Sequence, residues 1–340
     1  MKIAVRTRGM LVSAIVLLTN PIDPDETQRL RKHAEVRVAS SPVGAAFADE
    51  AMNADVIIVR SPISASILEH AHRLRGIVRH GAGVDIVPVE EATEKGIPVS
   101  NTPGANAVAV AEYVVGQMLQ LSRRLHTVDA RLRSEGWHVS RGLSDGANEL
   151  SGKTVGIIGV GAIGEALARI CHYGFQMPIM GYRRDPSKMS DYIRAAAVDD
   201  VFRTADFVVL ACPLTSETRG MVNRRTLGLM KQGAGIINVA RGAVINQDHL
   251  VDALAQEKIC AALDVFETQP LPEDSPLLRM PNVILSSHIA GITIESMRRI
   301  SALSVDQTLA LLAGRLPEPL VNPQVAQRAL KRMEMLETRR

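Results

Sequence analysis

The chain has 340 residues, of which 46% are hydrophobic and 22% charged, a composition typical of a water-soluble enzyme with two domains. Its net charge is only +3, and its five Phe, four Tyr and one Trp are not interleaved with any basic run. We therefore expect no nucleic-acid partner, because such a partner needs a basic patch or aromatic stacking platforms.

The cysteines and the longest apolar stretch indicate the cellular compartment of the protein. Each cysteine lies in or beside an apolar segment, and the three are Cys171, Cys212 and Cys260. We interpret them as reduced core residues, which predicts a cytoplasmic protein. No membrane span is expected, because residues 104–121 are interrupted by Glu112, Gln117 and Gln120. No metal site is predicted.

The amino terminus has the outline of a signal peptide, since basic residues precede the apolar run 10–18. The run lacks a small-residue cleavage site, and it leads into Thr19-Asn20-Pro21, a typical strand exit. We therefore predict a first β-strand over residues 11–18, with Met10 as an alternative start.

Two stretches alternate apolar runs with helical patterns, as in doubly wound parallel sheets. In the first, strands are predicted over residues 11–18, 36–39, 56–59, 76–79 and 97–100, and helices near Asp25, Val43, Ala65 and Pro88. In the second, strands are predicted near residues 154–159, 177–182, 207–211, 235–239, 260–264 and 282–286. The fold class is therefore α/β, with two Rossmann-like parallel-sheet domains and an interdomain cleft.

The two units are joined by helix rather than by a flexible linker. The predicted helix runs from about residue 106 to residue 126, without a Gly-, Pro- or Ser-rich segment beside it. A last amphipathic stretch, residues 292–312, is predicted to cross back to the first unit. The basic tail, residues 328–340, is predicted to be a solvated helix.

The second unit begins with the turn Gly159-Val160-Gly161-Ala162-Ile163-Gly164, between an apolar strand and a helix. In this context the glycines allow a tight turn and a close backbone approach to a pyrophosphate, while the helix N-terminus faces its charge. The turn therefore predicts dinucleotide binding.

The end of the next strand predicts which dinucleotide is bound. An acidic residue that binds the ribose 2′-hydroxyl is expected about 20 residues downstream of the turn. Arg183 stands there, followed by Arg184, and a guanidinium pairs with a 2′-phosphate. We therefore expect NADP(H) to be preferred. The alternative is that Asp185 serves as the acid, and NAD(H) is then possible.

Two further strand ends carry side chains suited to chemistry on an anion. Arg241 and His288 each follow an apolar strand at its carboxyl end, where open α/β sheets bind ligands. Either residue alone is more typical of a surface or core position, but their order beside a dinucleotide turn favours catalysis. Other histidines lack this context and are interpreted as structural or solvent-facing: His70, His72, His126, His138, His172 and His249.

Over nearly its whole length the chain resembles the D-2-hydroxyacid dehydrogenase family. The matching motifs, besides the glycine turn, are Gly81-Ala82-Gly83-Val84-Asp85, Asn101-Thr102-Pro103-Gly104-Ala105-Asn106, Pro213-Leu214-Thr215, Asn238-Val239-Ala240-Arg241-Gly242, Leu263-Asp264-Val265-Phe266 and His288-Ile289-Ala290-Gly291. The resemblance implies a substrate domain of residues 1–103 plus 291–340 and an inserted dinucleotide-binding domain of residues 104–290. It also implies a homodimer formed through an arm at about residues 123–150, which contains Trp137.

The resemblance assigns a catalytic or substrate-binding role to each matching residue. Arg241 would hold the substrate carboxylate and polarise its 2-oxo group, a task suited to a permanently charged fork. His288 would exchange the proton with the substrate oxygen, since imidazole titrates near the working pH. Backbone N–H groups around Ala82 and Gly83 would bind the carboxylate, because a glycine-rich loop lets main chain approach closely.

The resemblance also implies the cofactor contacts. Asp264 would face the nicotinamide end, with Asn106 near it. The full expected set is Gly159, Gly161, Ala162, Ile163, Gly164, Arg183, Arg184, Cys212, Pro213, Thr218, Val239, Ala240, Asp264 and Asn106.

The chain departs from the family at the third catalytic position. Most members have a glutamate just before the proline that follows Asp-Val-Phe, whereas this chain has Gln269. Glu267, two residues earlier, points in a different direction in an extended segment. An amide orients an imidazole without adding charge, so we expect His288 to titrate at a lower pH than in glutamate-bearing relatives.

The favoured function is NADPH-preferring reduction of small 2-oxo acids, of which glyoxylate and hydroxypyruvate are foremost. One alternative is an NAD-linked formate dehydrogenase, whose branch shares the glutamine but has a long amino-terminal extension. Another is 3-phosphoglycerate dehydrogenase, with Arg60 and Arg79 binding a phosphate, although both can equally be surface charges. An alternative of another class is a dinucleotide-sensing binding protein.

Overall fold

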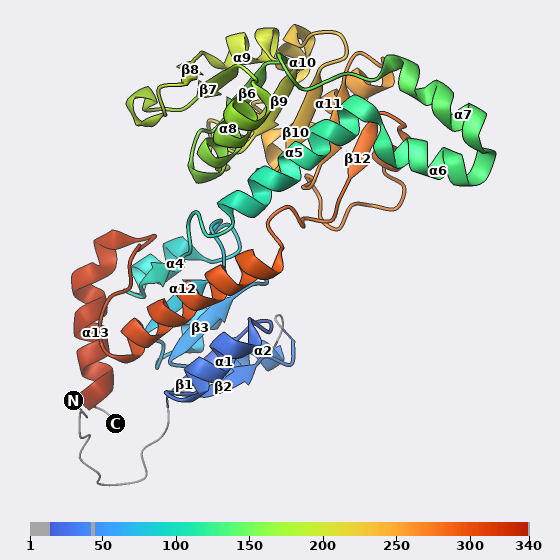
Figure 1. Ribbon diagram of the computed structural model, residues 1–340. Helices are drawn as coiled ribbons and strands as arrows, with labels where there is room; N and C mark the ends of the chain where they lie inside the picture. The colour runs from blue at the N-terminus through green and yellow to red at the C-terminus, as the bar shows by residue number, and fades with distance from the viewer. Residues whose placement is uncertain (1–13, 42–44, 339–340) are drawn as a thin grey trace. The chain divides into compact units, whose positions relative to one another are not determined.

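The computed structural model describes residues 14–41 and 45–338, and the chain divides into two α/β units (Figure 1). Unit 1 consists of Met1–Ala105 and Ile294–Arg340, and unit 2 of Asn106–Thr293. Each unit contains one parallel β-sheet, which confirms the predicted α/β class with two parallel-sheet domains. Residues 11–13 of the first predicted strand, Met10 and Val43 lie outside the described residues.

Unit 1 is built on a five-stranded sheet in the order β2-β1-β3-β4-β5. Its strands are β1 (Ile15–Leu18), β2 (Glu35–Val38), β3 (Val56–Val59), β4 (Gly76–Arg79) and β5 (Val99–Ser100). The central strands read as unbroken apolar runs because both faces of the sheet are covered; all four residues of β3 are fully buried.

Helices cover both faces of the unit 1 sheet. They are α1 (Pro24–Arg31), α2 (Ala45–Met52), α3 (Ile67–His70), α4 (Val89–Glu94), α12 (Ile294–Leu312) and α13 (Ala326–Thr338), with the 3-10 turn η5 (Pro323–Val325). Side chains of α2, α3 and α4 pack on one face, and those of α1, α12 and α13 on the other. The stretch predicted to cross back is therefore α12, a helix of unit 1.

Unit 2 is built on a seven-stranded sheet in the order β12-β11-β10-β9-β6-β7-β8. Its strands are β6 (Val155–Ile158), β7 (Ile179–Tyr182), β8 (Ile193–Ala195), β9 (Phe207–Leu210), β10 (Gly235–Asn238), β11 (Cys260–Leu263) and β12 (Val283–Leu285). The order reverses at β6, so the turn after β6 lies at the topological switch point, where such sheets bind ligands.

Helices also cover both faces of the unit 2 sheet. They are α5 (Ala107–Arg123), α8 (Ala162–Phe175), α9 (Val198–Thr204), α10 (Arg224–Leu229) and α11 (Gln247–Ala255), with 3-10 turns η2 (Pro186–Lys188), η3 (Gly242–Val244) and η4 (Pro276–Arg279). Apolar side chains of α5 and α8 share one core, and those of α9, α10 and α11 share the other. Figure 1 shows α5 and α8 side by side on their face of the sheet.

An arm projects from unit 2 between α5 and β6. It consists of α6 (Leu125–Glu135), α7 (Trp137–Gly142) and the 3-10 turn η1 (Leu143–Gly146), and Figure 1 shows α6 and α7 standing away from the sheet. The amide of Asn148 donates to the carbonyl oxygen of Ser122 at 3.0 Å, which closes the arm at its base. In the part of the chain that is described, no helix is both long and apolar enough to cross a membrane.

Two expectations from the sequence were wrong. Strand β8 was missed, because only Ile193 of its three residues is buried and the strand lies at the sheet edge. The tail is not a solvated helix: Ala329 and Met333 of α13 are buried in unit 1. Arg332 of that helix donates through Nε to the Leu74 carbonyl oxygen at 2.9 Å.

Candidate active site

The glycine turn joins β6 to α8 in a conformation that requires glycine. Gly159 has a φ of +98°, and a Cβ there would lie 2.5 Å from the Cα of Cys212. Gly161 is the N-cap of α8 and supplies no side-chain cap. The first N–H groups of the helix, at Ala162, Ile163 and Gly164, therefore remain available to an anion, and the helix dipole favours negative charge there.

A cavity of about 420 Å³ extends from this turn to the end of β7 and the loop after β9. Its wall includes Gly161, Arg183, Arg184 and Thr218. A Cβ at Gly161 would meet no atom within 4 Å, so the space above the turn is open to a ligand. Open backbone donors, an uncapped helix terminus and nearby guanidinium groups together fit a dinucleotide with its pyrophosphate at the turn.

Arg183 and Asp185 have different partners at the far end of this cavity. The Nη1 group of Arg183 donates to the carbonyl oxygens of Val160 at 2.9 Å and Lys188 at 3.1 Å. These bonds fix the guanidinium and leave its Nε and Nη2 donors without an acceptor among the described residues. Asp185 Oδ1 instead accepts from the hydroxyl of Ser187 at 2.6 Å and from its amide at 3.3 Å.

The loop after β9 brings Cys212, Pro213 and Thr218 to the same cavity. The Thr218 hydroxyl donates to the Pro213 carbonyl oxygen at 2.7 Å, which closes the loop. Burial raises the pKa of Cys212 to about 11, so its thiol stays neutral and adds no negative charge near a phosphate. Glu217, which the sequence analysis did not single out, also lines this cavity.

Arg241 follows β10 in a turn held by a buried asparagine. Asn238 is 1% exposed; its Oδ1 accepts from the Ala240 amide at 3.0 Å, and its Nδ2 donates to the Arg241 carbonyl oxygen at 3.1 Å. Gly242 then lies so close to the segment after β11 that a Cβ at Gly242 would be 1.9 Å from the carbonyl carbon of Phe266. The motif places the half-buried Arg241 side chain at the carboxyl end of the sheet, with Val239 and Ala240 just before it.

His288 follows β12 and is exposed, with a φ of +59°. Its Nδ1 lies 3.2 Å from Oε1 of Gln269. An amide oxygen only accepts, so Nδ1 carries the proton of this contact. The predicted pairing of the histidine with an amide is thus present in the geometry, at the same sheet edge as Arg241 and the glycine turn.

Asp264 and Asn106 lie against the loop that carries His288. Asp264 follows β11, is 2% exposed, and accepts hydrogen bonds from the backbone of Ile289 and Ala290. Asn106 is the N-cap of α5, and its Nδ2 is 2.6 Å from where a Cβ of Gly291 would stand. Both residues therefore help to shape this loop, a role that the sequence reasoning missed.

The loop with Ala82 and Gly83 belongs to unit 1 and follows β4. Arg79 lies beneath it and donates to the carbonyl oxygens of Gly83 at 2.8 Å, Val59 at 3.2 Å and His80. Asn101 Nδ2 donates to the Ala82 carbonyl oxygen at 2.6 Å. These bonds turn the loop's carbonyl groups inward. Neither Arg79 nor Arg60 is a free surface charge, since Arg60 donates to the Pro21 carbonyl oxygen.

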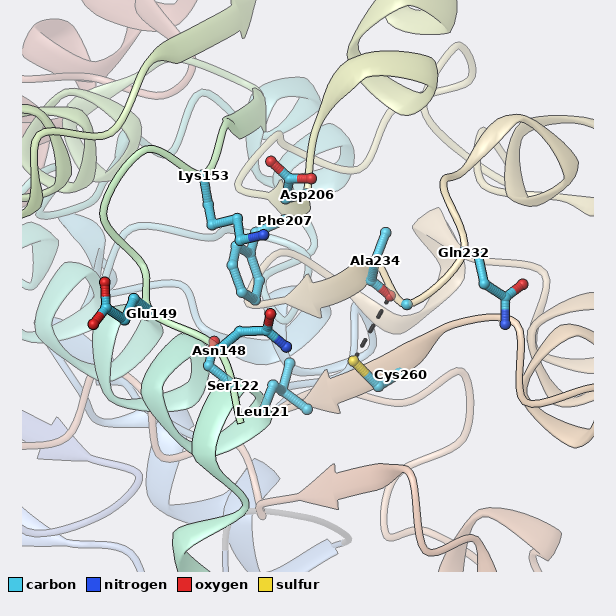
Figure 2. A pocket seen from close by; sticks show the side chains of 11 residues that line it. Leu121, Ser122, Asn148, Glu149, Lys153, Asp206, Phe207, Gln232, Ala234 and Cys260 are labelled. Carbon is cyan, nitrogen blue, oxygen red and sulfur yellow. Dashed lines mark hydrogen bonds between the residues drawn. The ribbon is translucent and has the colours of Figure 1, made fainter. Parts of the chain in front are cut away.

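Two further cavities occur in unit 2. One of about 670 Å³, with a largely apolar wall, lies beside His288 and includes Phe266, Gln269, Leu271 and Leu278. The other, of about 180 Å³, is drawn in Figure 2 and lies at the amino ends of β9, β10 and β11, where Cys260 Sγ contacts the Ala234 carbonyl oxygen at 3.7 Å. It contains none of the predicted site residues. No group of three or more potential metal ligands occurs among the described residues.

Comparison with known proteins identifies similar chains. A family model described as D-isomer specific 2-hydroxyacid dehydrogenase, NAD binding domain, matches residues 115–290. A hydroxypyruvate reductase of Thermotoga maritima is 38% identical over 84% of this chain and 94% of its own length. A D-3-phosphoglycerate dehydrogenase of Methanocaldococcus jannaschii is 37% identical over 94% of this chain, which spans only 62% of that relative. The crystal structure of a Thermus thermophilus protein aligns with a TM-score of 0.82 and 32% identity over 90% of this chain and 99% of that one.

Proposed function

Because the chain belongs to the D-isomer specific 2-hydroxyacid dehydrogenase family, we propose that it is an NADPH-preferring reductase of small 2-oxo acids, with glyoxylate and hydroxypyruvate as substrates. The observation that carries the proposal is the placement of Arg241 and His288 at one sheet edge with the glycine turn. Relatives that are named glyoxylate or hydroxypyruvate reductases support this choice of substrates.

In the proposed reaction the nicotinamide cofactor supplies the hydride that reduces the carbonyl carbon. Arg241 holds the carboxylate and stabilises the negative charge that develops on the carbonyl oxygen. His288 donates a proton from Nε2 to that oxygen while Nδ1 remains hydrogen-bonded to Gln269. In the reverse direction Nε2 accepts the proton. Backbone N–H groups of Ala82 and Gly83 are proposed to bind the carboxylate, as the family resemblance implies.

The cofactor contacts are proposed from the same unit. The turn residues Gly159 and Gly161 with the N-terminus of α8 would hold the pyrophosphate, and Arg183 would pair with the 2′-phosphate of NADPH. Two observations support Arg183 over Asp185: the guanidinium is fixed with donors to spare, and the carboxylate is used by Ser187. The Ser187 hydroxyl also holds the pKa of Asp185 below its usual range.

The cofactor preference is tested by the ratio of kcat/KM for NADPH to that for NADH. We expect the wild type to favour NADPH at least about tenfold, and Arg183→Asp to lower the ratio by roughly 10- to 100-fold, because a charge-assisted hydrogen bond is lost. Arg203→Asp, which makes the same charge change at an exposed arginine paired with Asp200 on α9, is the matched control. Equal use of both cofactors by the wild type would overturn the NADP(H) proposal.

The reaction class is tested by NADPH oxidation with a panel of 2-oxo acids. Glyoxylate and hydroxypyruvate head the panel, and 2-oxo acids with apolar side chains follow, since the cavity beside His288 has apolar walls. Absence of turnover with every acid, despite tight cofactor binding, would favour a dinucleotide-sensing protein. Oxidation of formate with NAD would instead favour the formate dehydrogenase alternative.

Oxidation of 3-phosphoglycerate is the second candidate activity. The extensive match to the Methanocaldococcus jannaschii enzyme favours it. The charges of Arg60 and Arg79 both act on His80, so the two guanidiniums lie near each other and near the Gly81–Gly83 loop. Nη1 of Arg60 and both Nε and Nη1 of Arg79 donate to backbone carbonyl oxygens, which weakens the case for a phosphate site. A kcat/KM for 3-phosphoglycerate above that for the corresponding small hydroxy acids would favour this candidate.

Assembly and location complete the proposal. We propose a homodimer formed through the arm of α6 and α7, whose exposed side chains include Leu132, Trp137 and Val139. A cytoplasmic location is proposed because Cys171, Cys212 and Cys260 are all free thiols, which suit a reducing compartment.

A further inference from the structure

The loop that carries His288 is held in an unusual backbone conformation by one buried carboxylate. His288 has a φ of +59°, in the left-handed region that costs a non-glycine residue about 1–2 kcal/mol. Its amide donates to the Asp264 carbonyl oxygen at 2.8 Å. The next two amides, of Ile289 and Ala290, donate to Asp264 Oδ1 at 2.8 Å and Oδ2 at 2.9 Å. Such a conformation persists only where its surroundings hold it, and here Asp264 does so.

The carboxylate of Asp264 is held in turn by a chain of two hydroxyl groups. Ser286 Oγ lies 2.6 Å from Asp264 Oδ1, and the Tyr113 hydroxyl lies 2.6 Å from Ser286 Oγ. An ionised carboxylate only accepts hydrogen bonds, so Ser286 must donate to Asp264. The serine oxygen is then left as the acceptor for the tyrosine hydroxyl. The direction of the chain is therefore fixed: Tyr113 donates to Ser286, and Ser286 donates to Asp264.

Tyr113 is anchored on a rigid element. It lies on α5, whose residues Val110, Val114 and Met118 are buried in the core that α5 shares with α8 and the sheet. The tyrosine is half-buried, and burial raises its pKa, so its hydroxyl remains protonated and able to donate at physiological pH. These two hydrogen bonds thus connect the packed face of α5 to the Asp264 carboxylate, which holds the His288 loop.

We propose that Tyr113, acting through Ser286 and Asp264, is a positioning residue that fixes the His288 loop for proton transfer. The inference rests on the proposed function of His288 as the group that exchanges the substrate's proton. The hydrogen bonds from Tyr113 to Ser286 and from Ser286 to Asp264 do not require Tyr113 to contact substrate or cofactor. Its removal is expected to act on the chemical step and to leave cofactor affinity unchanged.

The kinetic test compares Tyr113→Phe, Ser286→Ala and Ser286→Thr. We expect the first two to lower kcat roughly fivefold with KM for NADPH unchanged, because each breaks the chain without touching the cofactor cavity. Ser286→Thr keeps the hydroxyl and is expected to restore most of the rate. The double variant Tyr113→Phe/Ser286→Ala is expected to match Ser286→Ala, since residues of one chain are not additive. Tyr173→Phe, at an exposed tyrosine on α8, is the matched control.

A second measurement does not depend on activity. Amide hydrogen exchange followed by mass spectrometry reports the opening of residues 288–290, and we expect faster exchange there in Tyr113→Phe and Ser286→Ala than in wild type or Tyr173→Phe. If no 2-oxo acid is turned over by the wild type, the proposed function fails, and the exchange result still decides whether Tyr113 holds the loop. Wild-type exchange in both variants would overturn the inference. So would wild-type kcat in both variants, or additive losses in the double variant.

Discussion

At the scale of single residues, His288 has an amide rather than a carboxylate beside it. Gln269 Oε1, 3.2 Å from Nδ1, accepts the hydrogen bond that orients the ring. The amide does not stabilise the imidazolium by charge, whereas a carboxylate in the same place would. Glu267, which stands two positions before Gln269 in the sequence, is exposed. Replacing Gln269 with a carboxylate therefore tests how a charge beside His288 affects the pH dependence of the reaction.

Gln269→Glu is expected to move the pH profile of reduction to higher pH. Reduction needs the protonated imidazole, so kcat/KM for the 2-oxo acid falls as the pH rises through the pKa of His288. A neighbouring carboxylate raises that pKa, which shifts the alkaline limb upward by roughly one unit. The measurement is kcat/KM from about pH 5 to about pH 9. Glu267→Gln serves as the control and should leave the limb in place; an unmoved limb in Gln269→Glu would contradict the interpretation.

Residue roles that depend on local pattern were readable from the sequence, and those that depend on distant partners were not. Arg241 and His288 stand at strand ends, so their placement at one sheet edge follows from the parallel topology. The contact of Tyr113 with Ser286 joins residues 173 positions apart, and no periodicity marks it. Asn238 was visible inside its motif, but only the folded turn gives its two bonds to Ala240 and Arg241.

At the scale of secondary-structure elements, β4 and α12 are joined through a buried histidine. His80 follows β4, is 4% exposed, and its Nε2 lies 2.9 Å from Ser301 Oγ on α12. The Asp23 amide donates to the same Ser301 oxygen at 3.1 Å. Burial lowers the pKa of His80 to about 3, and the charges of Arg60 and Arg79 act in the same direction. The imidazole is therefore neutral in the folded protein.

This buried imidazole is expected to make the protein less stable in mild acid. The unfolded chain takes up a proton on His80 below about pH 6.5, whereas the folded chain does so only near pH 3. Stability is thus complete above about pH 6.5 and falls as the pH is lowered through this window, by at most about 1.4 kcal/mol per pH unit. The fall is measured as the difference in urea midpoint between pH 7 and pH 5, followed by circular dichroism.

His80→Gln removes the titrating group while keeping a side chain that can bond Ser301. We expect the loss of stability between pH 7 and pH 5 to be smaller in this variant than in the wild type. His70→Gln, at an exposed histidine of the same unit, is the control and should retain the wild-type loss. An equal loss in all three proteins would contradict a buried neutral His80.

Element prediction succeeded where burial leaves a strong pattern. Strands β3 and β9 are unbroken apolar runs buried on both faces, and they were found within one residue of their ends. Strand β8 has one buried residue of three, so it carries no such run. The charges along α13 suggested a solvated helix, yet Ala329 and Met333 are buried and Arg332 donates to the Leu74 carbonyl oxygen.

At the scale of the whole molecule, the repeated strand and helix pattern predicted two α/β units in one chain. The division after Ala105 and Thr293 places the carboxyl-terminal helices α12 and α13 with the first unit, although the whole of unit 2 separates them from β5 along the chain. The sequence placed the junctions after residues 103 and 290. The arm is different, because it projects from unit 2 and its helix α6 has no buried residue.

The arm leads to the prediction of a dimer that depends on its apolar side chains. Helix α6 has no buried residue, while Leu132 and Trp137 are 42% and 64% exposed. Large apolar side chains gathered on a projecting segment mark an interaction site, and a symmetric contact with a second copy is the commonest way to cover one.

Light scattering after gel filtration should give twice the 36.8 kDa chain mass for the wild type. Leu132→Asp/Trp137→Asp should give one chain mass, whereas Tyr173→Asp, at an exposed aromatic outside the arm, should remain dimeric. A monomeric wild type would overturn the predicted dimer, and a dimer that survives both arm substitutions would assign the contact elsewhere.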